Sequence, residues 1–129
     1  MAELTTILYV EDDLDIQAVA QMALEAVGGF TVTLASSGES GLAAAAATQP
    51  DLILLDVMMP TMDGPATLVA LKADPTLARI PVIFVTAKVQ STEVEHYKSL
   101  GAVDVIAKPF DPMTLSDAVR TIWTRAVSS

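Results

Sequence analysis

The sequence predicts an α/β protein, a doubly wound sheet of five parallel strands with helices on both faces. Five short apolar runs closed by turn residues alternate with segments of helical periodicity, and only short connections separate them. The chain has 129 residues, 52% of them hydrophobic, which suits one core. We therefore expect a single domain over residues 1–129, with its packed part over about residues 5–126.

The first strand and the first helix follow each other directly. Residues 5–10 are rich in β-formers and end in the acids Glu11, Asp12 and Asp13, the last of which is suited to cap a helix. Apolar residues then recur at helical spacing over residues 14–27, until a glycine pair ends the pattern. The stripe expected to face the core is Ile16, Val19 and Ala23.

A second strand and helix are expected next. Residues 30–35 form an apolar, β-branched run. Ser36, followed three residues later by Glu39, has the spacing of a capping box. Alanine is the best helix former, so the alanine run over residues 43–47 predicts a helix that Pro50 stops.

The third strand is expected at the centre of the sheet. The apolar run over residues 52–55 does not alternate, which is typical of a strand buried on both faces, and Asp56 lies at its C-terminal end. Asp63 and Gly64 are expected to shape the following loop and cap a third helix over residues 65–73, which begins with a proline.

The last two strands and helices follow the same rules. Residues 81–86 and 103–107 are apolar runs bounded by turn residues. Thr92 with Glu95 has the spacing of a capping box for the helix between them. Asp111, followed by a proline, is expected to cap the final helix.

Charge and composition exclude several classes of function. The 16 acidic and 7 basic residues give a formal net charge of −9, which repels nucleic-acid phosphate and anionic lipid, so direct binding to either is not expected. The chain has no cysteine, hence no disulfide and no thiolate site. The N-terminus lacks signal-peptide character and no apolar tract is long enough to span a membrane, so we expect a cytoplasmic protein.

Polar side chains fall at the C-terminal ends of four predicted strands. These residues are Glu11, Asp12, Asp56, Thr86 and Lys108. The carboxyl ends of parallel strands meet at one edge of a sheet, where ligands bind. Three carboxylates and one ammonium leave a charge of about −2, which favours a divalent cation, and oxygen ligands without histidine or cysteine favour Mg²⁺.

This set of groups is suited to phosphoryl transfer. A carboxylate beside a metal ion and a lysine can attack phosphorus, because both cations neutralise charge that develops on the phosphoryl oxygens. Asp56 is the candidate nucleophile, and the hydroxyl of Thr86 can donate a hydrogen bond to the same oxygens.

The motifs YVEDD, LLDVMMPTMDG, VTAK and KPF give the chain a resemblance, over almost its whole length, to the receiver domain of two-component response regulators. It is similar to the single-domain receivers of chemotaxis. The resemblance implies a flavodoxin-like (βα)5 fold with strand order 2-1-3-4-5. It also implies that Asp56 accepts a phosphoryl group from a sensor histidine kinase or a histidine phosphotransfer protein.

The resemblance further implies a Mg²⁺ site. Asp12 and Asp56 would bind the ion directly, Glu11 would act through water, and the backbone carbonyl of Met58 would be a further ligand. Lys108 would pair with the carboxylate or the phosphoryl group, after a cis peptide bond to the following proline.

Signalling would then pass through protein contacts. Thr86 would follow the phosphoryl group inward and move the loop after the fourth strand. The output surface would be made by the fourth helix, the fifth strand and the fifth helix, in a monomer or weak dimer. Such a protein is not an enzyme beyond its own phosphorylation and dephosphorylation.

Two features depart from the family pattern. Receivers usually carry Tyr or Phe three residues before the site lysine, and this chain has Val105. Met58 and Lys88 occupy positions expected to flank the phosphoryl group, so our hypothesis is that they tune the lifetime of the phosphorylated form.

Three alternative functions compete with this interpretation. A haloacid-dehalogenase phosphatase needs a second Asp where Met58 stands, and a flavin carrier needs a hydroxyl- and glycine-rich loop where the first acids stand. A degenerate receiver would act only as a phosphorylation-independent binding module, an alternative that Val105 keeps open. His96 is expected to be exposed, and Tyr97 and Trp123 to serve packing or an interface.

Overall fold

The computed structural model describes residues 3–128 and confirms the predicted α/β architecture. All strand pairs are parallel, and the order across the sheet is β2-β1-β3-β4-β5, as the resemblance implied. The elements are β1 Thr6–Val10, α1 Leu14–Met22, the π-helix η1 Ala23–Val27, β2 Thr31–Ala35, α2 Gly38–Thr48, β3 Leu52–Asp56, α3 Gly64–Ala73, β4 Val82–Thr86, α4 Ser91–Ser99, β5 Asp104–Ala107 and α5 Leu115–Ser128.

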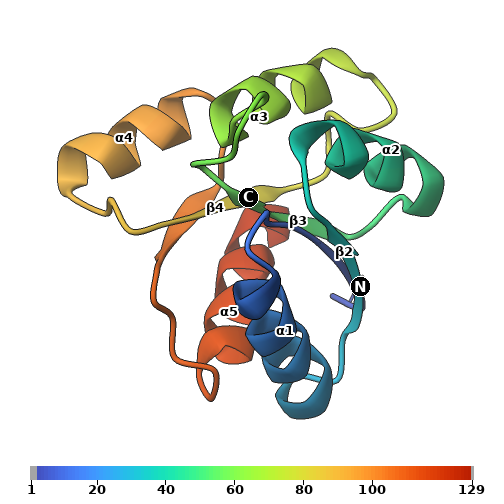
Figure 1. Ribbon diagram of the computed structural model, residues 1–129, viewed down its shortest axis with the longest axis vertical. Coiled ribbons are helices and arrows are strands. Elements are labelled where there is room, and N and C mark those ends of the chain that lie inside the picture. Colours follow the sequence, from blue (N-terminus) through green and yellow to red (C-terminus); the bar gives the residue numbers. More distant parts are fainter. Residues whose placement is uncertain (1–2, 129) are drawn as a thin grey trace.

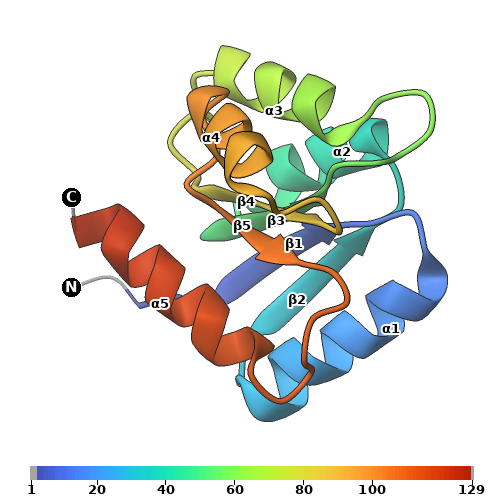
Figure 2. The same cartoon turned by 90° about the vertical axis from the view of Figure 1, so that its left-hand side faces the viewer.

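The helices form one layer on each side of the sheet. In Figures 1 and 2, α1 and α5 cover one face, and α2, α3 and α4 cover the other. Side chains alternate between the two faces along each strand, so Tyr9 and Leu54 belong to the α1/α5 core and Leu55 and Phe84 to the opposite core. Every residue of β3 and β4 is buried, which explains their unbroken apolar pattern.

Two predicted helix starts are confirmed. The Asp13 carboxylate accepts hydrogen bonds from the backbone N–H groups of Asp15 and Ile16 and caps α1. The Asp63 carboxylate accepts from the Ala66 N–H at 2.9 Å and caps α3, which has a proline in its first turn.

The predicted capping box of α2 is wrong by one residue. Because the helix begins at Gly38, the N-cap is Ser37, and its partner three residues on is Ser40 instead of Glu39. A Cβ on Gly38 would lie 2.5 Å from Thr67 Oγ1 of α3, so close packing of the two helices sets where α2 begins.

The capping box predicted for α4 is wrong, and α5 begins later than predicted. Helix α4 begins at Ser91, its N-cap is Gln90 without a side-chain hydrogen bond, and the Thr92 hydroxyl instead donates to Glu93. Asp111 accepts from the N–H of Met113 at 2.8 Å, but the residues that follow form a turn, and α5 begins only at Leu115. Thr92 therefore lies inside α4 instead of before it, and residues 112–114 form a turn where the sequence pattern predicted the start of α5.

The first helix departs from the prediction in two ways. Its last turn is a π-helix, and its buried positions include Gln17, Ala20 and Ala23, spaced three residues apart. Val19 lies about 100° around the helix from Ala20 and is 40% exposed, so its predicted core position is wrong. Ile16, in contrast, packs partly against the core.

Candidate functional site

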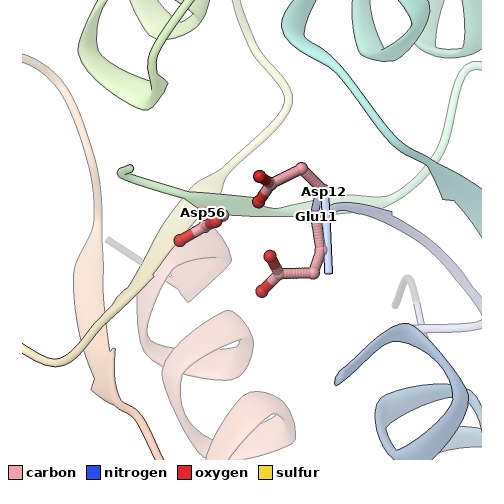
Figure 3. Close-up of side chains that lie close together, drawn as sticks. All are labelled: Glu11, Asp12 and Asp56. Carbon is pink, nitrogen blue, oxygen red and sulfur yellow. The ribbon is translucent and has the colours of Figure 1, made fainter. Parts of the chain in front are cut away.

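The three predicted acids meet at the C-terminal edge of the sheet. Figure 3 shows Glu11 and Asp12 projecting from the end of β1 and Asp56 from the end of the neighbouring β3. Each offers a carboxylate oxygen, and these oxygens all lie within 4.8 Å of one another. A divalent cation can contact such a set, so the donor chemistry and the spacing fit Mg²⁺.

Lys108 extends from the loop after β5 into the same space. Its Nζ lies 2.9 Å from Glu11 Oε1 and 3.1 Å from Asp56 Oδ1. The Lys108–Pro109 peptide bond is cis, as expected. The Lys108 N–H donates to the Thr86 carbonyl at 2.9 Å, which joins the lysine segment to the end of β4. The structure thus brings the strand-end residues of β1, β3, β4 and β5 together.

Burial governs the electrostatics of this cluster. Glu11 is 0% exposed and Asp56 2% exposed. Burial raises the pKa of the Glu11 carboxyl to about 7, and neighbouring Asp56 acts in the same direction, while the hydrogen bond from Lys108 opposes both. Burial lowers the pKa of Lys108, but its hydrogen bonds to Glu11 and Asp56 outweigh this, so its pKa lies above the ordinary value. The single Lys108 ammonium therefore does not neutralise the charge of the three carboxylates, which favours a bound cation.

Close packing holds Asp56 in place. A Cβ on Gly64 would lie 2.4 Å from the Asp56 carbonyl oxygen, so only glycine fits at the start of α3. The Gly64 N–H donates to the Val57 carbonyl at 2.9 Å and closes the loop between β3 and α3. Met58 lies in this loop with its side chain 67% exposed, and its role as a carbonyl ligand stays a prediction.

Thr86 is buried at the end of β4, and its hydroxyl oxygen accepts from the Lys88 N–H at 3.1 Å. Two residues earlier on the same face, Phe84 is the register partner of Val105 on β5. The ring of Tyr97, from α4, meets Phe84 edge-on with the ring centroids 5.1 Å apart. The aromatic residues on this side of the sheet thus include Phe84 of β4 and Tyr97 of α4, while the Val105 position on β5 is aliphatic.

Two residues near the acids were not found by sequence reasoning. The Tyr9 hydroxyl donates to Glu11 Oε1 at 3.3 Å, and the Gln17 amide donates to the Glu11 backbone carbonyl. The signals available in the sequence were a tyrosine in a predicted strand and a glutamine in a predicted helix. Neither signal shows, in the absence of the three-dimensional structure, that the residue contacts the acidic cluster.

The remaining predicted positions behave as expected for packing or surface residues. Tyr97 and Trp123 are each 7% exposed, and the Trp123 indole donates to the Asp51 carbonyl at the opposite end of the sheet. His96 is exposed on α4. None of the helices formed by residues 3–128 has the length and apolar character needed to cross a bilayer.

An apolar groove of about 480 Å³ opens beside Lys108. Its lining residues come from α1 and from the segments that follow β4 and β5. They are Asp15, Ile16, Val19, Ala87, Lys108, Pro109 and Phe110. The groove includes Val19, which the sequence pattern assigned to the core.

Comparisons with known proteins agree with this geometry. Residues 7–120 match the family model of the response regulator receiver domain. The transcriptional regulatory protein CseB of Streptomyces avermitilis is 41% identical over 125 residues, which cover 97% of this chain and 52% of that protein. The alkaline phosphatase synthesis transcriptional regulatory protein PhoP of Bacillus subtilis is 36% identical over 120 residues, 93% of this chain and 49% of that protein. The chain therefore spans about half the length of these curated relatives.

Solved structures show the same fold. The chemotaxis response regulator CheY4 of Vibrio cholerae has a TM-score of 0.86 at 27% identity, covering 92% of this chain and 98% of that one. The N-terminal domain of a response regulator receiver protein from Methanoculleus marisnigri has a TM-score of 0.74 at 41% identity, covering 92% and 96%. The fold is thus the flavodoxin-like fold that the resemblance implied. This chain belongs to the response regulator receiver domain family of two-component signalling.

Proposed function

We propose that this chain accepts a phosphoryl group on Asp56 from a phosphorylated histidine kinase or phosphotransfer protein, in a Mg²⁺-dependent reaction, and signals through protein contacts. The observation that carries this proposal is the position of Lys108 Nζ, 2.9 Å from Glu11 and 3.1 Å from Asp56. A buried carboxylate that contacts a lysine and adjoins two further acids is arranged for phosphoryl chemistry rather than for stability.

In the transfer step, a carboxylate oxygen of Asp56 attacks phosphorus. A P–O bond forms while the P–N bond of the phosphohistidine donor breaks, and the imidazole leaves with the bonding electrons. The Lys108 ammonium neutralises charge on the phosphoryl oxygens, and the Thr86 hydroxyl donates a hydrogen bond to one of them. In dephosphorylation, water attacks phosphorus, the P–O bond to Asp56 breaks, and the free carboxylate is restored. The chain acts only on itself and is not a general enzyme.

The residues proposed to hold Mg²⁺ are Asp12 and Asp56 directly, Glu11 through water, and the Met58 backbone carbonyl. The spacing of the three carboxylates, of which Glu11 and Asp56 are buried and Asp12 is exposed, supports this assignment. When bound, the ion supplies positive charge for the phosphoryl oxygens.

Output is proposed to occur at the surface formed by α4, β5 and α5. Asp104 at the start of β5 lies 3.8 Å from Lys98 of α4 and 3.6 Å from Arg125 of α5, so ion pairs link the three elements. We also propose that residues 1–129 act as one receiver domain, a monomer or weak dimer, in the cytoplasm. The net charge of −9 argues against direct nucleic-acid contact by this chain.

The deciding experiment is phosphorylation with acetyl phosphate and Mg²⁺, followed by intact-protein mass spectrometry. We expect the added mass of one phosphoryl group, which EDTA and Asp56→Asn each abolish. Asp63→Asn is the matched control, because Asp63 lies in the loop after the same strand and caps α3. The control variant should be labelled like the wild type.

The competing function is a binding module that does not use phosphorylation, which the aliphatic Val105 favours. Failure of the wild type to take up a phosphoryl group, from acetyl phosphate and from a phosphorylated kinase alike, would contradict the proposed function and favour the binding module.

Met58 and Lys88 are proposed to set the lifetime of the phosphorylated form. Both side chains are exposed and belong to the loops that leave β3 and β4 at the site edge. Met58→Asn and Lys88→Glu should change the rate at which the phosphoryl mass disappears after excess acetyl phosphate is removed. Rates equal to that of the wild type would refute this assignment.

A further inference from the structure

Glu11 is held by a buried hydrogen-bond network that extends below the acidic cluster. Tyr9 precedes it by two residues on β1 and therefore points to the same face of the sheet, with its ring in the core between α1 and α5. Tyr9 is 0% exposed, and its hydroxyl donates to Glu11 Oε1 at 3.3 Å. The Tyr9 side chain therefore packs in the hydrophobic core and contacts the acidic cluster through its hydroxyl group.

The Glu11 carboxylate has two further donors. Its Oε1 also accepts from Lys108 Nζ at 2.9 Å, and its Oε2 accepts from the Asp13 N–H at 3.2 Å. Lys108 is shared with Asp56 and has a flexible stem. The Tyr9 hydroxyl, in contrast, is carried by a ring packed in the core and serves Glu11, so it fixes the carboxylate independently of events at Asp56.

The backbone of Glu11 is held by a separate contact. Gln17 of α1 is only 7% exposed, and its Nε2 donates to the Glu11 carbonyl and to the Ala35 carbonyl at 3.5 Å. The Glu11 N–H also donates to the Ala35 carbonyl, at 2.9 Å. Gln17 therefore ties α1 to the point where β1 and β2 end and the loop with Asp12 begins.

We propose that Tyr9 and Gln17 are positioning residues of the Mg²⁺ site, Tyr9 through the side chain of Glu11 and Gln17 through its backbone. This inference rests on the proposed function. Outer partners that orient metal-binding groups typically contribute ten- to a hundredfold to metal affinity. Removal of either donor should therefore weaken Mg²⁺ binding by about tenfold. A purely structural role predicts lower stability with unchanged affinity.

The test is calorimetric titration of Mg²⁺ into the wild type, Tyr9→Phe and Gln17→Met. Tyr97→Phe is the control for Tyr9, because it removes a hydroxyl from another buried tyrosine that lies on the opposite face of the sheet. Ser116→Ala is the control for Gln17, because the Ser116 hydroxyl also donates from a buried side chain to a backbone carbonyl. Trp123 fluorescence cannot serve as the reporter, since Trp123 lies at the other end of the sheet.

The expected result is a Kd for Mg²⁺ raised about tenfold in Tyr9→Phe and Gln17→Met, with both controls at the wild-type value. Circular dichroism of each variant checks the fold, and Gln17→Met keeps the test decisive should Tyr9→Phe not fold. As a second readout, acetyl-phosphate labelling of the two variants should be slow at low Mg²⁺ and recover at saturating Mg²⁺, because the defect is in affinity.

Two negative results have different meanings. Wild-type Mg²⁺ affinity in folded Tyr9→Phe and Gln17→Met would overturn the positioning roles and leave the proposed function intact. Absence of Mg²⁺ binding by the wild type would overturn the positioning roles and the proposed function together.

Discussion

The metal-free protein should lose stability as the pH rises through the range in which Glu11 titrates. Burial, aided by Asp56, raises the pKa of this carboxyl from 4.5 to about 7 in the folded protein. Between these two values the folded state binds more protons than the unfolded state. The stabilising contribution is therefore complete below pH 4.5 and is lost as the pH rises through about 7.

The size of the effect follows from the same two values. The difference between 4.5 and about 7 corresponds to a fall of about 3 kcal/mol in the free energy of unfolding. The Glu11 side chain is only 1% exposed, so solvent screens its charge little. A change of this size is a large part of the stability of a small domain.

Other shifted groups act outside this range. Hydrogen bonds lower the pKa of Asp51, despite its burial, so its contribution to stability is lost only in acid, as the pH falls through that lowered value. The raised pKa values of Tyr9 and Lys108 reduce stability only above their ordinary values of 10.0 and 10.5. The slope between pH 5 and 8 therefore reports on Glu11.

Urea unfolding in EDTA at several pH values between 5 and 8 measures this slope. Glu11→Gln keeps the size of the side chain but cannot ionise, so it should remove most of the decline. Glu39→Gln, at an exposed position of α2, should follow the wild type. Saturating Mg²⁺ should also counter the decline, because the ion binds the ionised carboxylates and its stabilising effect grows as they lose protons.

The reasoning would be refuted by a metal-free wild type whose stability is constant or rises between pH 5 and 8. It would also be refuted by a decline that persists unchanged in Glu11→Gln.

Three further predictions concern the site and its supports. Gly64→Ala should destabilise the protein by about 2 kcal/mol, measured by urea unfolding, because its Cβ would lie 2.4 Å from the Asp56 carbonyl oxygen; stability equal to that of the wild type would contradict this. Ser37→Ala should cost about 1 kcal/mol and Ser36→Ala much less, since only Ser37 caps α2, and equal losses would contradict the cap assignment. Lys108→Met should bind Mg²⁺ more tightly in calorimetry, because the substitution removes a cation that competes for the same carboxylates. The variant should nevertheless be labelled more slowly by acetyl phosphate, measured by mass spectrometry, because it lacks the ammonium that neutralises the phosphoryl oxygens. An unchanged labelling rate would exclude a role for the ammonium.

The strand-end residues could be predicted because only local patterns were needed. Apolar runs that end in Asp56 or Lys108 mark strands, and a parallel sheet necessarily brings the C-terminal ends of its strands to one edge. Helix caps were harder, since the spacing of Ser36 and Glu39 fits a capping box as well as that of Ser37 and Ser40. Packing of α2 against α3 decides between them, and a local pattern contains no information about that contact.

The residues that support the site, Tyr9 and Gln17, could not be predicted from the sequence for a different reason. Tyr9 and Gln17 are buried, and burial of such residues usually reflects packing. Their polar atoms contact Glu11 only because the fold places the end of β1 beside α1. Val19 is an apolar residue that its helical spacing assigned to the core. In the structure it lines the groove next to Lys108 and is 40% exposed.

The contacts beneath α4 offer a route by which phosphorylation of Asp56 could affect the output surface, although position 105 carries a valine instead of an aromatic residue. Thr86 contacts the loop to α4 through the Lys88 N–H, at 3.1 Å. It also shares its face of β4 with Phe84, whose ring meets Tyr97 of α4. One connection runs from Thr86 to the loop before α4, and the other runs from Phe84 to α4 itself. The proposed movement of Thr86 can therefore be passed to this helix by contacts that do not require a side-chain switch on β5.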